Sequence, residues 1–590
     1  MTTAIGAIAP QIKVSQADLS EDWLDNLIQM RVARAASLMG RATLTFSDFG
    51  FSLSSSDTFT LGTEVVISEP TGGTLFKGTV TGVDLEQLPG SVPRLVVVAD
   101  DDAYKLTRGT RTTTYLQGTY KQALTTLGGV VGITMQVAES TLTMEYLLQS
   151  GSDLDFLNAV ADRLGYAWWV DEGVLIVKPL ALGTSVATLT LGEDLLEFGV
   201  RASGLRPSMV SIHGWSPDQQ NDVEDQNAAA AAGTPPDFVQ GYTGNKPSSQ
   251  LSPAPTALTE PRPLTAAEAK MVATARYGDA TSAATVARGR GYVDSTIKPG
   301  VTITVNDAGP ASGDYLVTEV EHIYDRHGFL TKFVSGSRRP AGLVDMLGRD
   351  APDPGFVMPG LVVGVVTDNN DPDTAGRVKV RYTGVGAPVE SPWARVVTLG
   401  GGAARGAVFN PEVNDEVLVG FEHGDTRRPV VIGGLFSKQN TLPTGNAYVA
   451  EGKVNYRRIA SRKNHIVEFA DGDQPTQQHI LLQLGTATHK LRLGADRCDL
   501  EVEEGKGLTI KAGSAKFDIS SSGDVTIEGN NITIKGTMGV TVEAGTTATL
   551  KGDVDAVVQG AVEAKVKSDA IASVEASGIL TLKGATVAIN

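Results

Sequence analysis

The chain has 590 residues and a mass of 61.8 kDa, which is too long for one hydrophobic core and predicts about three to five structural units. Apolar residues make up 41% and charged residues 20%, which excludes a disordered chain, and no apolar stretch approaches the ~18 residues of a membrane span. The formal net charge of −17 argues against a nucleic-acid partner, because phosphates require a basic surface.

The start of the chain and its cysteine content indicate where the protein is made. The first ten residues place no basic segment ahead of their apolar residues, which argues against a secretory signal. The single cysteine, Cys498, permits neither a disulfide within the chain nor a zinc site built from cysteines. We therefore expect synthesis in the reducing cytoplasm.

A helix followed by a hairpin is predicted within residues 146–179. Ser152 is typical of a helix N-cap and Gly165 of a C-cap, and the apolar residues between them have helical spacing. Two strands are expected in residues 168–177, joined by a turn at residues 171–173.

A second helix is predicted to begin after Thr265. Thr265 and Glu268 have the spacing of a capping box, in which each side chain bonds the other residue's backbone N–H. Strands are expected around 301–305 and 315–320. Residues 216–263, which are rich in alanine and proline, are expected to form an irregular excursion.

Residues 356–436 predict a small β-barrel of the OB type. Asp368 and Asp371 lie in a turn whose spacing differs from that of an EF-hand, so we interpret it as a plain turn. OB barrels often bind oligonucleotides or sugars, and a glycan-binding role remains an alternative. The five predicted strands are residues 361–366, 376–382, 393–397, 416–421 and 429–432.

The sequence offers little chemistry. It contains no H-E-x-x-H motif, no G-x-S-x-G motif and no phosphate-binding loop with its lysine. The acidic pairs Asp153/Asp155 and Glu503/Glu504 are expected to serve as a helix cap and a solvated face. We therefore expect no catalytic residue, no cofactor and no metal site. If three copies of the chain share an axis, an ion on that axis within residues 441–504 remains an alternative, with three histidines as its candidate ligands: His465, His479 and His489.

The last 86 residues, 505–590, form a repeat of about eight residues, in which each block carries two apolar residues two positions apart. Both members of such a pair lie on one face of a strand. One ribbon of this kind buries too little to be stable alone, so its apolar face must stack on a neighbour. The expected core positions are Leu508, Ile510, Ile532, Ile534, Val540, Val542, Leu550, Val558, Val566, Val574, Leu580 and Leu582.

Three arrangements can provide that neighbour. Eight residues per turn are few for a solenoid coil built from one chain, and a surface meander would not need so many consecutive pairs. An intertwined oligomer, a trimer with one strand per chain in each layer, suits the repeat best.

These motifs together resemble the VgrG proteins and the hub–spike proteins of contractile phage tails. The barrel carries the resemblance in GLVVGVVTDNNDPDTAGRVKVRY, SPWARVV and PEVNDEVLVGFEHGDTRRPVVIGGLF, and the N-terminal part carries it in YLLQSGSDLDFLNAVADRLGYAWWVDEGVLIVKP and LTAAEAKMVATARY. The resemblance implies a mainly β homotrimer with four parts. They are a hub of two β-barrel-like subdomains with a few helices (1–350), an OB-fold barrel (351–440), a neck (441–504) and a triple-stranded β-helical needle (505–590).

The family further implies a role and partners. The chain would be the central spike of an extracellular contractile injection system or phage-tail-like particle, assembled in the cytoplasm and then released or ejected, with a type VI VgrG spike that delivers effectors as the alternative. The hub would contact the tail tube and inner baseplate, and the needle would cross the target membrane transiently. A small PAAR-type tip protein would seat on the end of the needle: Thr586, Val587, Ala588, Ile589 and Asn590. An adhesin and a spike-borne enzyme are further alternatives, although residues 441–504 are too few for the lysozyme that some phage spikes insert there.

Overall fold

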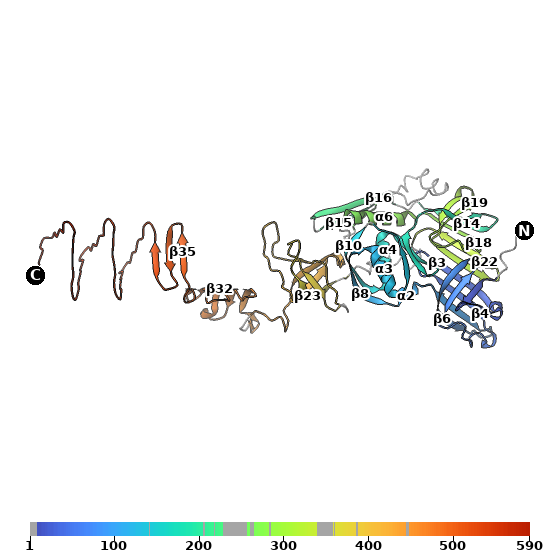
Figure 1. Ribbon diagram of the computed structural model, residues 1–590, viewed down its shortest axis with the longest axis horizontal. Coiled ribbons are helices and arrows are strands. Elements are labelled where there is room, and N and C mark those ends of the chain that lie inside the picture. Colours follow the sequence, from blue (N-terminus) through green and yellow to red (C-terminus); the bar gives the residue numbers. More distant parts are fainter. Residues whose placement is uncertain are drawn as a thin grey trace. The chain divides into compact units, whose positions relative to one another are not determined.

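The computed structural model describes residues 9–140, 142–203, 207–216, 219–227, 256–259, 265–282, 285–338, 358, 360–384, 388–443 and 448–589. The chain divides into two compact units, Met1–Thr441 and Leu442–Asn590, which are drawn together in Figure 1. Most of the predicted excursion 216–263 lies outside the described residues, as does Asn590. None of the described helices is long and apolar enough to cross a membrane.

An antiparallel sheet of eleven strands forms the largest element of the first unit. Apolar and polar residues alternate along most of its strands, so that one face is buried. Met30, Leu44, Phe46 and Val97 lie in its core, where Trp23 packs edge to face on Phe46 with ring centres 5.0 Å apart. The strands in spatial order are β14 (Leu195–Ala202), β18 (Thr285–Tyr292), β22 (Gly328–Ser335), β21 (Glu319–Asp325), β3 (Leu27–Ala35), β4 (Arg41–Ser47), β7 (Arg94–Asp100), β6 (Thr74–Glu86), β5 (Glu64–Ser68), β1 (Gln11–Val14) and β2 (Ala17–Asp18).

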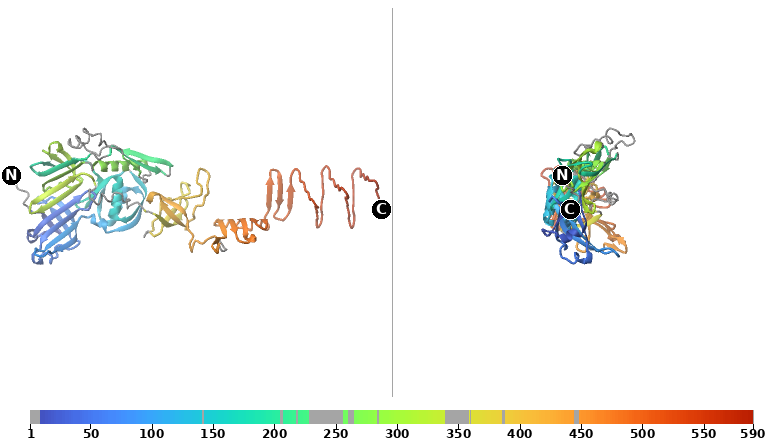
Figure 2. Two further views of the ribbon diagram at one scale, coloured as in Figure 1. Left: turned by 180° about the vertical axis from the view of Figure 1, so that it is seen from behind. Right: turned by 90° about the vertical axis from the view of Figure 1, so that its right-hand side faces the viewer.

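Three helices and a two-stranded ribbon lie between this sheet and the barrel (Figures 1 and 2). The helices are α2 (Tyr104–Thr107), α3 (Tyr120–Val131) and α4 (Asp153–Leu164), and the ribbon pairs β8 (Thr110–Thr119) with β10 (Thr143–Ser152). Phe156, Leu157 and Trp168 are fully buried in the core that these elements share.

The predicted helix and hairpin are confirmed. The Ser152 hydroxyl accepts a hydrogen bond from the Asp155 N–H at 3.0 Å, and Gly165 ends α4 in the left-handed conformation with φ 69°. β11 (Tyr166–Asp171) and β12 (Val174–Pro179) follow as an antiparallel pair, and β9 (Thr134–Val137) adds to β12 in parallel.

Two smaller sheets complete the hub. One contains β13 (Ser185–Thr190), β19 (Thr302–Asn306) and β20 (Gly313–Leu316). The other contains β15 (Val210–Ser216), β16 (Asn221–Asn227) and β17 (Thr256–Thr259), and α6 (Ala266–Ser282) packs against it through Val272, Ala273 and Tyr277.

The barrel has the five strands that the sequence predicts. Their spatial order is β24 (Lys379–Tyr382), β23 (Leu361–Asp368), β26 (Glu416–Phe421), β27 (Pro429–Gly434) and β25 (Arg395–Val396). Val366, Val378, Val380, Val417 and Val419 form its core.

The acidic turn of the barrel is held by Asp371. Its carboxylate accepts hydrogen bonds from three backbone N–H groups, those of Asp373, Ala375 and Arg377, at 2.9–3.2 Å. The Arg377 guanidinium also bonds it, 2.8 Å from Nη2 to Oδ1, and this bond above all holds the pKa of Asp371 well below its ordinary value.

The second unit contains three sheets. β28 (Val449–Ala450) pairs with β29 (Lys453–Val454). The largest sheet orders β30 (Tyr456–Ala460), β31 (Ile466–Asp471), β32 (Gln478–Gln483), β33 (Lys490–Gly494) and β34 (Cys498–Glu501). The third contains β35 (Leu508–Ala512), β36 (Ala515–Ile519) and β37 (Val525–Glu528).

The first three octads of the tail therefore form strands in the predicted places. Their apolar pairs lie opposite one another, because Ile510 faces Phe517 and Phe517 faces Ile527. From residue 530 to 589 the described chain continues in successive passes without a further strand, and every residue in it is exposed (Figure 1). The tail alone therefore encloses no core, unlike a single-chain solenoid.

The turn at Asp371 gives a first prediction. Asp371→Asn removes a charge that three backbone N–H groups and the Arg377 guanidinium stabilise, and we expect it to lower the free energy of unfolding of the barrel by about 2–3 kcal/mol at pH 7. Because the folded-state pKa is depressed, this stabilisation is fully present above the unfolded-state pKa of ~3.9 and is lost progressively as the pH falls from there through the much lower folded-state pKa. The difference between the calorimetric melting temperatures of the two proteins should therefore be narrower at pH 3 than at pH 7.

Asp368→Asn is the matched control, because the half-buried Asp368 carboxylate accepts one backbone N–H, that of Asn370. A gap between wild type and Asp371→Asn that is as wide at pH 3 as at pH 7 would contradict the assignment.

Candidate functional site: the joint between hub and barrel

The hub and the barrel meet at a strand that belongs to both of their cores. β10 contributes Met144 and Leu147 to the helical core of the hub. The same strand contributes Tyr146 and Leu148 to the barrel core, where they pack in one cluster with Val380 and the other barrel residues. Burial raises the pKa of the Tyr146 hydroxyl above its ordinary value, and the nearby charge of Glu390 adds to this shift. The first layer of the joint is therefore a dry apolar contact.

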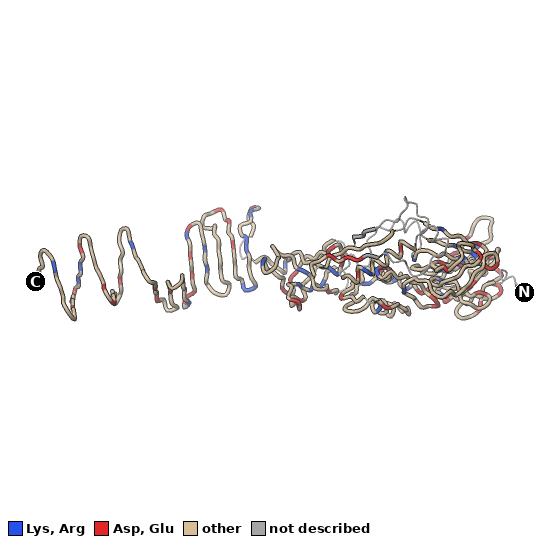
Figure 3. The backbone as a smooth tube through the Cα atoms, turned by 90° about the horizontal axis from the view of Figure 1, so that it is seen from above, with Lys and Arg blue, Asp and Glu red and all other residues tan. Residues whose placement is uncertain are grey.

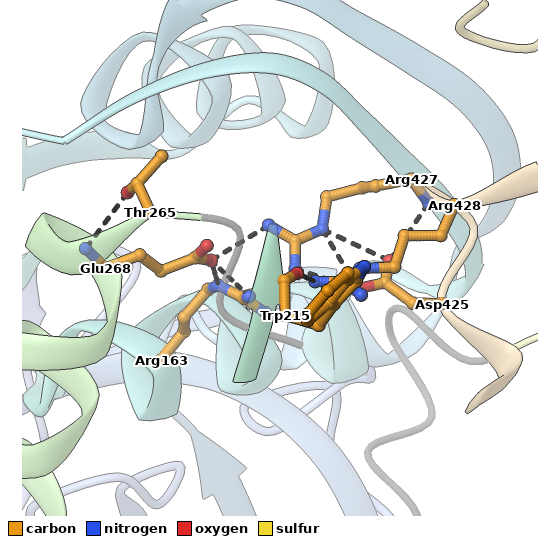
Figure 4. Close-up of polar contacts among 7 residues, drawn as sticks. All are labelled: Arg163, Trp215, Thr265, Glu268, Asp425, Arg427 and Arg428. Carbon is orange, nitrogen blue, oxygen red and sulfur yellow. Dashed lines mark hydrogen bonds and ion pairs between the residues drawn. The ribbon is translucent and has the colours of Figure 1, made fainter. Parts of the chain in front are cut away.

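A cluster of buried charges forms the second layer (Figure 4). Glu268 on α6 accepts hydrogen bonds from two arginines, one from each side of the joint. Arg163 Nε, on α4, lies 2.8 Å from Glu268 Oε1, and Arg427 Nη1, in the turn between β26 and β27, lies 2.8 Å from the same oxygen. Arg427 also forms a fork on Asp425, with Nη2 2.8 Å from Oδ2 and Nε 3.1 Å from Oδ1. The side chains of all four residues are at most 8% exposed.

The cluster balances its own charge. Burial alone would raise the pKa of Asp425 and lower that of Arg427. For Asp425, the positive charges of Arg427 and Arg163 outweigh the effect of burial. For Arg427, the negative charges of Glu268 and Asp425 do the same. The pKa of Asp425 therefore lies below, and that of Arg427 above, its ordinary value. Two guanidinium and two carboxylate groups thus remain charged in a site from which water is largely excluded.

A neighbouring arginine extends the contact to a third element of the hub. Arg428 Nη2 donates to the backbone oxygen of Trp215, at the end of β15, over 2.7 Å (Figure 4). Arg428 also lies 3.5 Å from Glu422 of the barrel. The barrel turn therefore contacts α6 and β15 through adjacent arginines, and Glu268 links it to Arg163 of α4.

Local sequence explains how the hub presents its half of the cluster. Gly165 allows α4 to end close to α6, because a Cβ at this position would lie 2.7 Å from the Cβ of Ala275. The Thr265 hydroxyl accepts the Glu268 N–H at 3.2 Å, which is one of the two hydrogen bonds predicted for a capping box. The Glu268 carboxylate, which a capping box would direct to the Thr265 backbone, bonds the two arginines.

The residues that the sequence singled out lie elsewhere. The predicted needle positions belong to the second unit, where those after Leu508 are all exposed, as are Thr586–Ile589. Asp153 and Asp155 do not form an acid pair, because Arg111 and Gln149 hold the buried Asp153 carboxylate and Ser152 bonds Asp155. In the neck, each of the three histidines has a different partner within the chain: the Gly485 N–H for His465, Glu468 for His479 and the Glu503 N–H for His489. The described residues contain no group of three metal-ligating side chains.

The apolar layer of the joint can be tested by removing one side chain. Leu148 is 1% exposed, so Leu148→Ala should lower the free energy of unfolding of the first unit by about 2–5 kcal/mol. Leu116→Ala is the matched control, since Leu116 lies on the paired strand β8 and is 64% exposed. Guanidinium denaturation followed by tryptophan fluorescence isolates this unit, because all five tryptophans lie in it. Equal effects of the two substitutions would contradict the shared core.

Two family models match the chain. Residues 362–436 match the type VI secretion system/phage-baseplate injector OB domain, and residues 6–325 match the Alg8 N-terminal domain. A curated relative, the type VI secretion system spike protein VgrG5 of Pseudomonas aeruginosa, is 30% identical over 155 residues, which is 24% of this chain. The match spans about a fifth, 19%, of the length of that relative.

Solved structures of similar fold include the c3393 protein of E. coli, described as a type VI secretion component similar to the T4 tail proteins gp27 and gp5. It is 16% identical and covers 72% of this chain and 100% of its own, with a TM-score of 0.48. The lidded PdpA–VgrG complex of Francisella is 8% identical and covers 89% and 81%, with a TM-score of 0.46. A 43 kDa tail protein of prophage MuSo2 from Shewanella oneidensis is 14% identical and covers 56% and 98%, with a TM-score of 0.43.

The match over residues 6–325 shows that this chain belongs to the Alg8 N-terminal domain family, and residues 362–436 match an injector OB domain of the kind found in type VI secretion systems and phage baseplates, which makes the chain similar to VgrG and phage-tail spike proteins.

Proposed function

We propose that this chain is the structural central spike of a contractile injection particle, in which it joins the tail tube and baseplate to a needle that pierces the target envelope. The observation that carries the proposal is the contrast between the two units. The first unit buries its own cores, whereas Ile466 and Ala470 are the last buried apolar side chains among the described residues of the second. Rows of exposed isoleucine, leucine and valine require a covering surface.

The neck sheet β30–β34 has its apolar face uncovered. Residues paired across an antiparallel sheet share a face, and the register places most of the isoleucine, leucine and phenylalanine side chains of the five strands on the same side, with Ile466 and Leu481 on the other. Most of them are exposed: Ile459, Phe469, Ile480, Leu482, Leu493 and Leu500.

The opposite face of the neck sheet is charged. Glu468 is buried there, 2.6 Å from Arg458 Nε and 3.2 Å from His479 Nε2. Lys490 and Glu501 form a further pair across β33 and β34, at 2.6 Å. A sheet with water on one side turns its apolar face to a core, so the apolar face of this sheet is the one that we expect to be covered.

We infer that two further copies of the chain provide the cover. The octad pairs add further exposed apolar residues along the tail, between charged residues that recur at intervals (Figure 3). Three sheets are the smallest number that closes a prism around an axis with every apolar face turned inward. Each isoleucine, leucine or valine that becomes fully buried would contribute roughly 1.5–3 kcal/mol, so the eleven octads can hold a trimer together strongly.

The remaining partners follow from this role. The hub would engage the tail tube and inner baseplate, the residues Thr586–Asn590 would seat a PAAR-type tip protein, and effectors are possible cargo. The work is mechanical and we assign no catalytic residue. The chain would be made in the cytoplasm and become part of the assembled particle. A type VI spike is the second candidate, because the curated relative has that name.

The trimer can be tested by placing charges on the predicted apolar face. The double substitution Val542→Asp/Val574→Asp should stop assembly, because a carboxylate between apolar faces loses its hydration. Light scattering on the wild type should give about three times 61.8 kDa, and the species should survive heating in detergent. The double variant should give the mass of one chain.

Thr541→Asp/Ser573→Asp is the matched control, since these residues lie between the members of the pairs and point to the other face. A heat-resistant trimer formed by the valine variant would overturn the predicted core. A wild-type monomer that binds glycans would favour the adhesin instead.

A further inference from the structure

The charge cluster of the joint draws together three segments that are remote in the sequence. Arg163 and Glu268 are 105 residues apart, and Glu268 and Arg427 are 159 apart. Glu268 is the one residue of the cluster that bonds both the hub arginine and the barrel arginine in Figure 4. Its carboxylate therefore links the hub to the barrel. The carboxylate of Asp425, in contrast, lies in the barrel turn and bonds Arg427 of the same turn.

The two arginines cannot adapt to the loss of this carboxylate. A guanidinium stays charged at any pH at which proteins fold. The positive charges of Arg163 and Arg427 repel each other, and the negative charge of Glu268 attracts both and so offsets this repulsion. Without the charge of Glu268, two buried guanidinium groups would remain beside the single carboxylate of Asp425. The interaction between the hub arginine and the barrel turn would then change from attraction to repulsion.

We propose that Glu268 is a conformational lock: its charged carboxylate fixes the barrel on the hub as one rigid body, and its loss frees the barrel to move while both parts stay folded. The lock itself stands on the geometry of the joint. Its use, to carry load from the hub into the needle without bending, rests on the proposed function.

Movement rather than unfolding is expected because each part has a core of its own. The helical core of the hub and the valine core of the barrel involve none of the four charged residues. The apolar contact through Tyr146 and Leu148 remains when Glu268 is changed, but such contacts are non-directional and hold the barrel less specifically. The charged hydrogen bonds, in contrast, require defined distances and angles between the two parts.

Hydrogen–deuterium exchange on the full-length protein tests the lock. Glu268→Gln keeps the shape of the side chain and removes its charge. Arg427→Met removes the cation of the barrel and leaves the Arg163–Glu268 pair of the hub intact, so the hub is not destabilised by unpaired arginines. Both variants should accelerate exchange at least tenfold in the peptides at the joint, which cover residues 144–149, 265–272 and 422–428. Exchange in the barrel core at 416–421 and in the hub core at 95–100 should stay as in the wild type.

Glu197→Gln is the matched control. Glu197 pairs with Arg290 in the same unit, but on the surface, and its loss should leave exchange at the joint unchanged. If neither variant changes exchange at the joint beyond this control, Glu268 is not a lock. If exchange rises equally at the joint and in both cores for both variants, the cluster serves folding and the proposal is also overturned. The solution mass of the variants should equal that of the wild type, so a failure of the trimer and a failure of the lock are distinguishable.

Discussion

The position of the barrel depends on a single strand that is shared by two hydrophobic cores. Leu147 of β10 packs among the helices of the hub, while Tyr146 and Leu148 pack among the barrel valines. Protein interiors are densely packed, so separating the barrel from β10 would open a cavity in the barrel core, whereas this non-directional apolar contact does not by itself fix the orientation of the barrel about the strand. This contact explains why hub and barrel form one compact unit. The apolar contact holds the two parts together, and the buried charges around Glu268 fix their relative orientation.

The two units differ in how their apolar surface is covered. In the first unit, apolar and polar residues alternate along the strands, and the apolar face packs on a core formed by the same chain. In the second, apolar and polar residues also alternate, but most apolar residues on one side of β30–β34 and in the octad pairs stay exposed in the described chain. The neck sheet places its charges on the more buried face, around Glu468, and its leucines and isoleucines on the exposed one. In the proposed function, further copies of the chain would cover this apolar surface, which is why that proposal depends on the trimer.

Local features of the fold could be predicted from the sequence, and contacts between remote segments could not. Ser152 and Gly165 mark the ends of α4 because capping involves residues within one turn. The five barrel strands and the first octads follow from an alternation of period two. The joint escaped prediction because its residues lie 105 and 159 positions apart, and because Glu268 also fits a capping box. Arg427 and Arg428 carried no signal beyond two arginines in a turn. For the octads after residue 529, the strands remain a prediction, since a strand requires a partner to pair with.

The choice of charges for the joint and of apolar pairs for the needle has a physical reason. A buried ion cluster is a poor source of stability, because the hydration lost by its four groups offsets most of their attraction, and apolar residues of the same volume often stabilise a protein more. A cluster at the joint is therefore better explained by geometry: the fork of Arg427 on Asp425 and its bond to Glu268 admit one relative orientation of barrel and hub. The needle has the opposite requirement. Apolar pairs impose little direction, but the intertwined chains of the proposed trimer could not separate one at a time, so their resistance to unfolding would be kinetic as well as thermodynamic. A spike that is pushed from its hub needs a fixed orientation at the joint and slow unfolding at the needle, and in the proposed function the residues at each place would provide it.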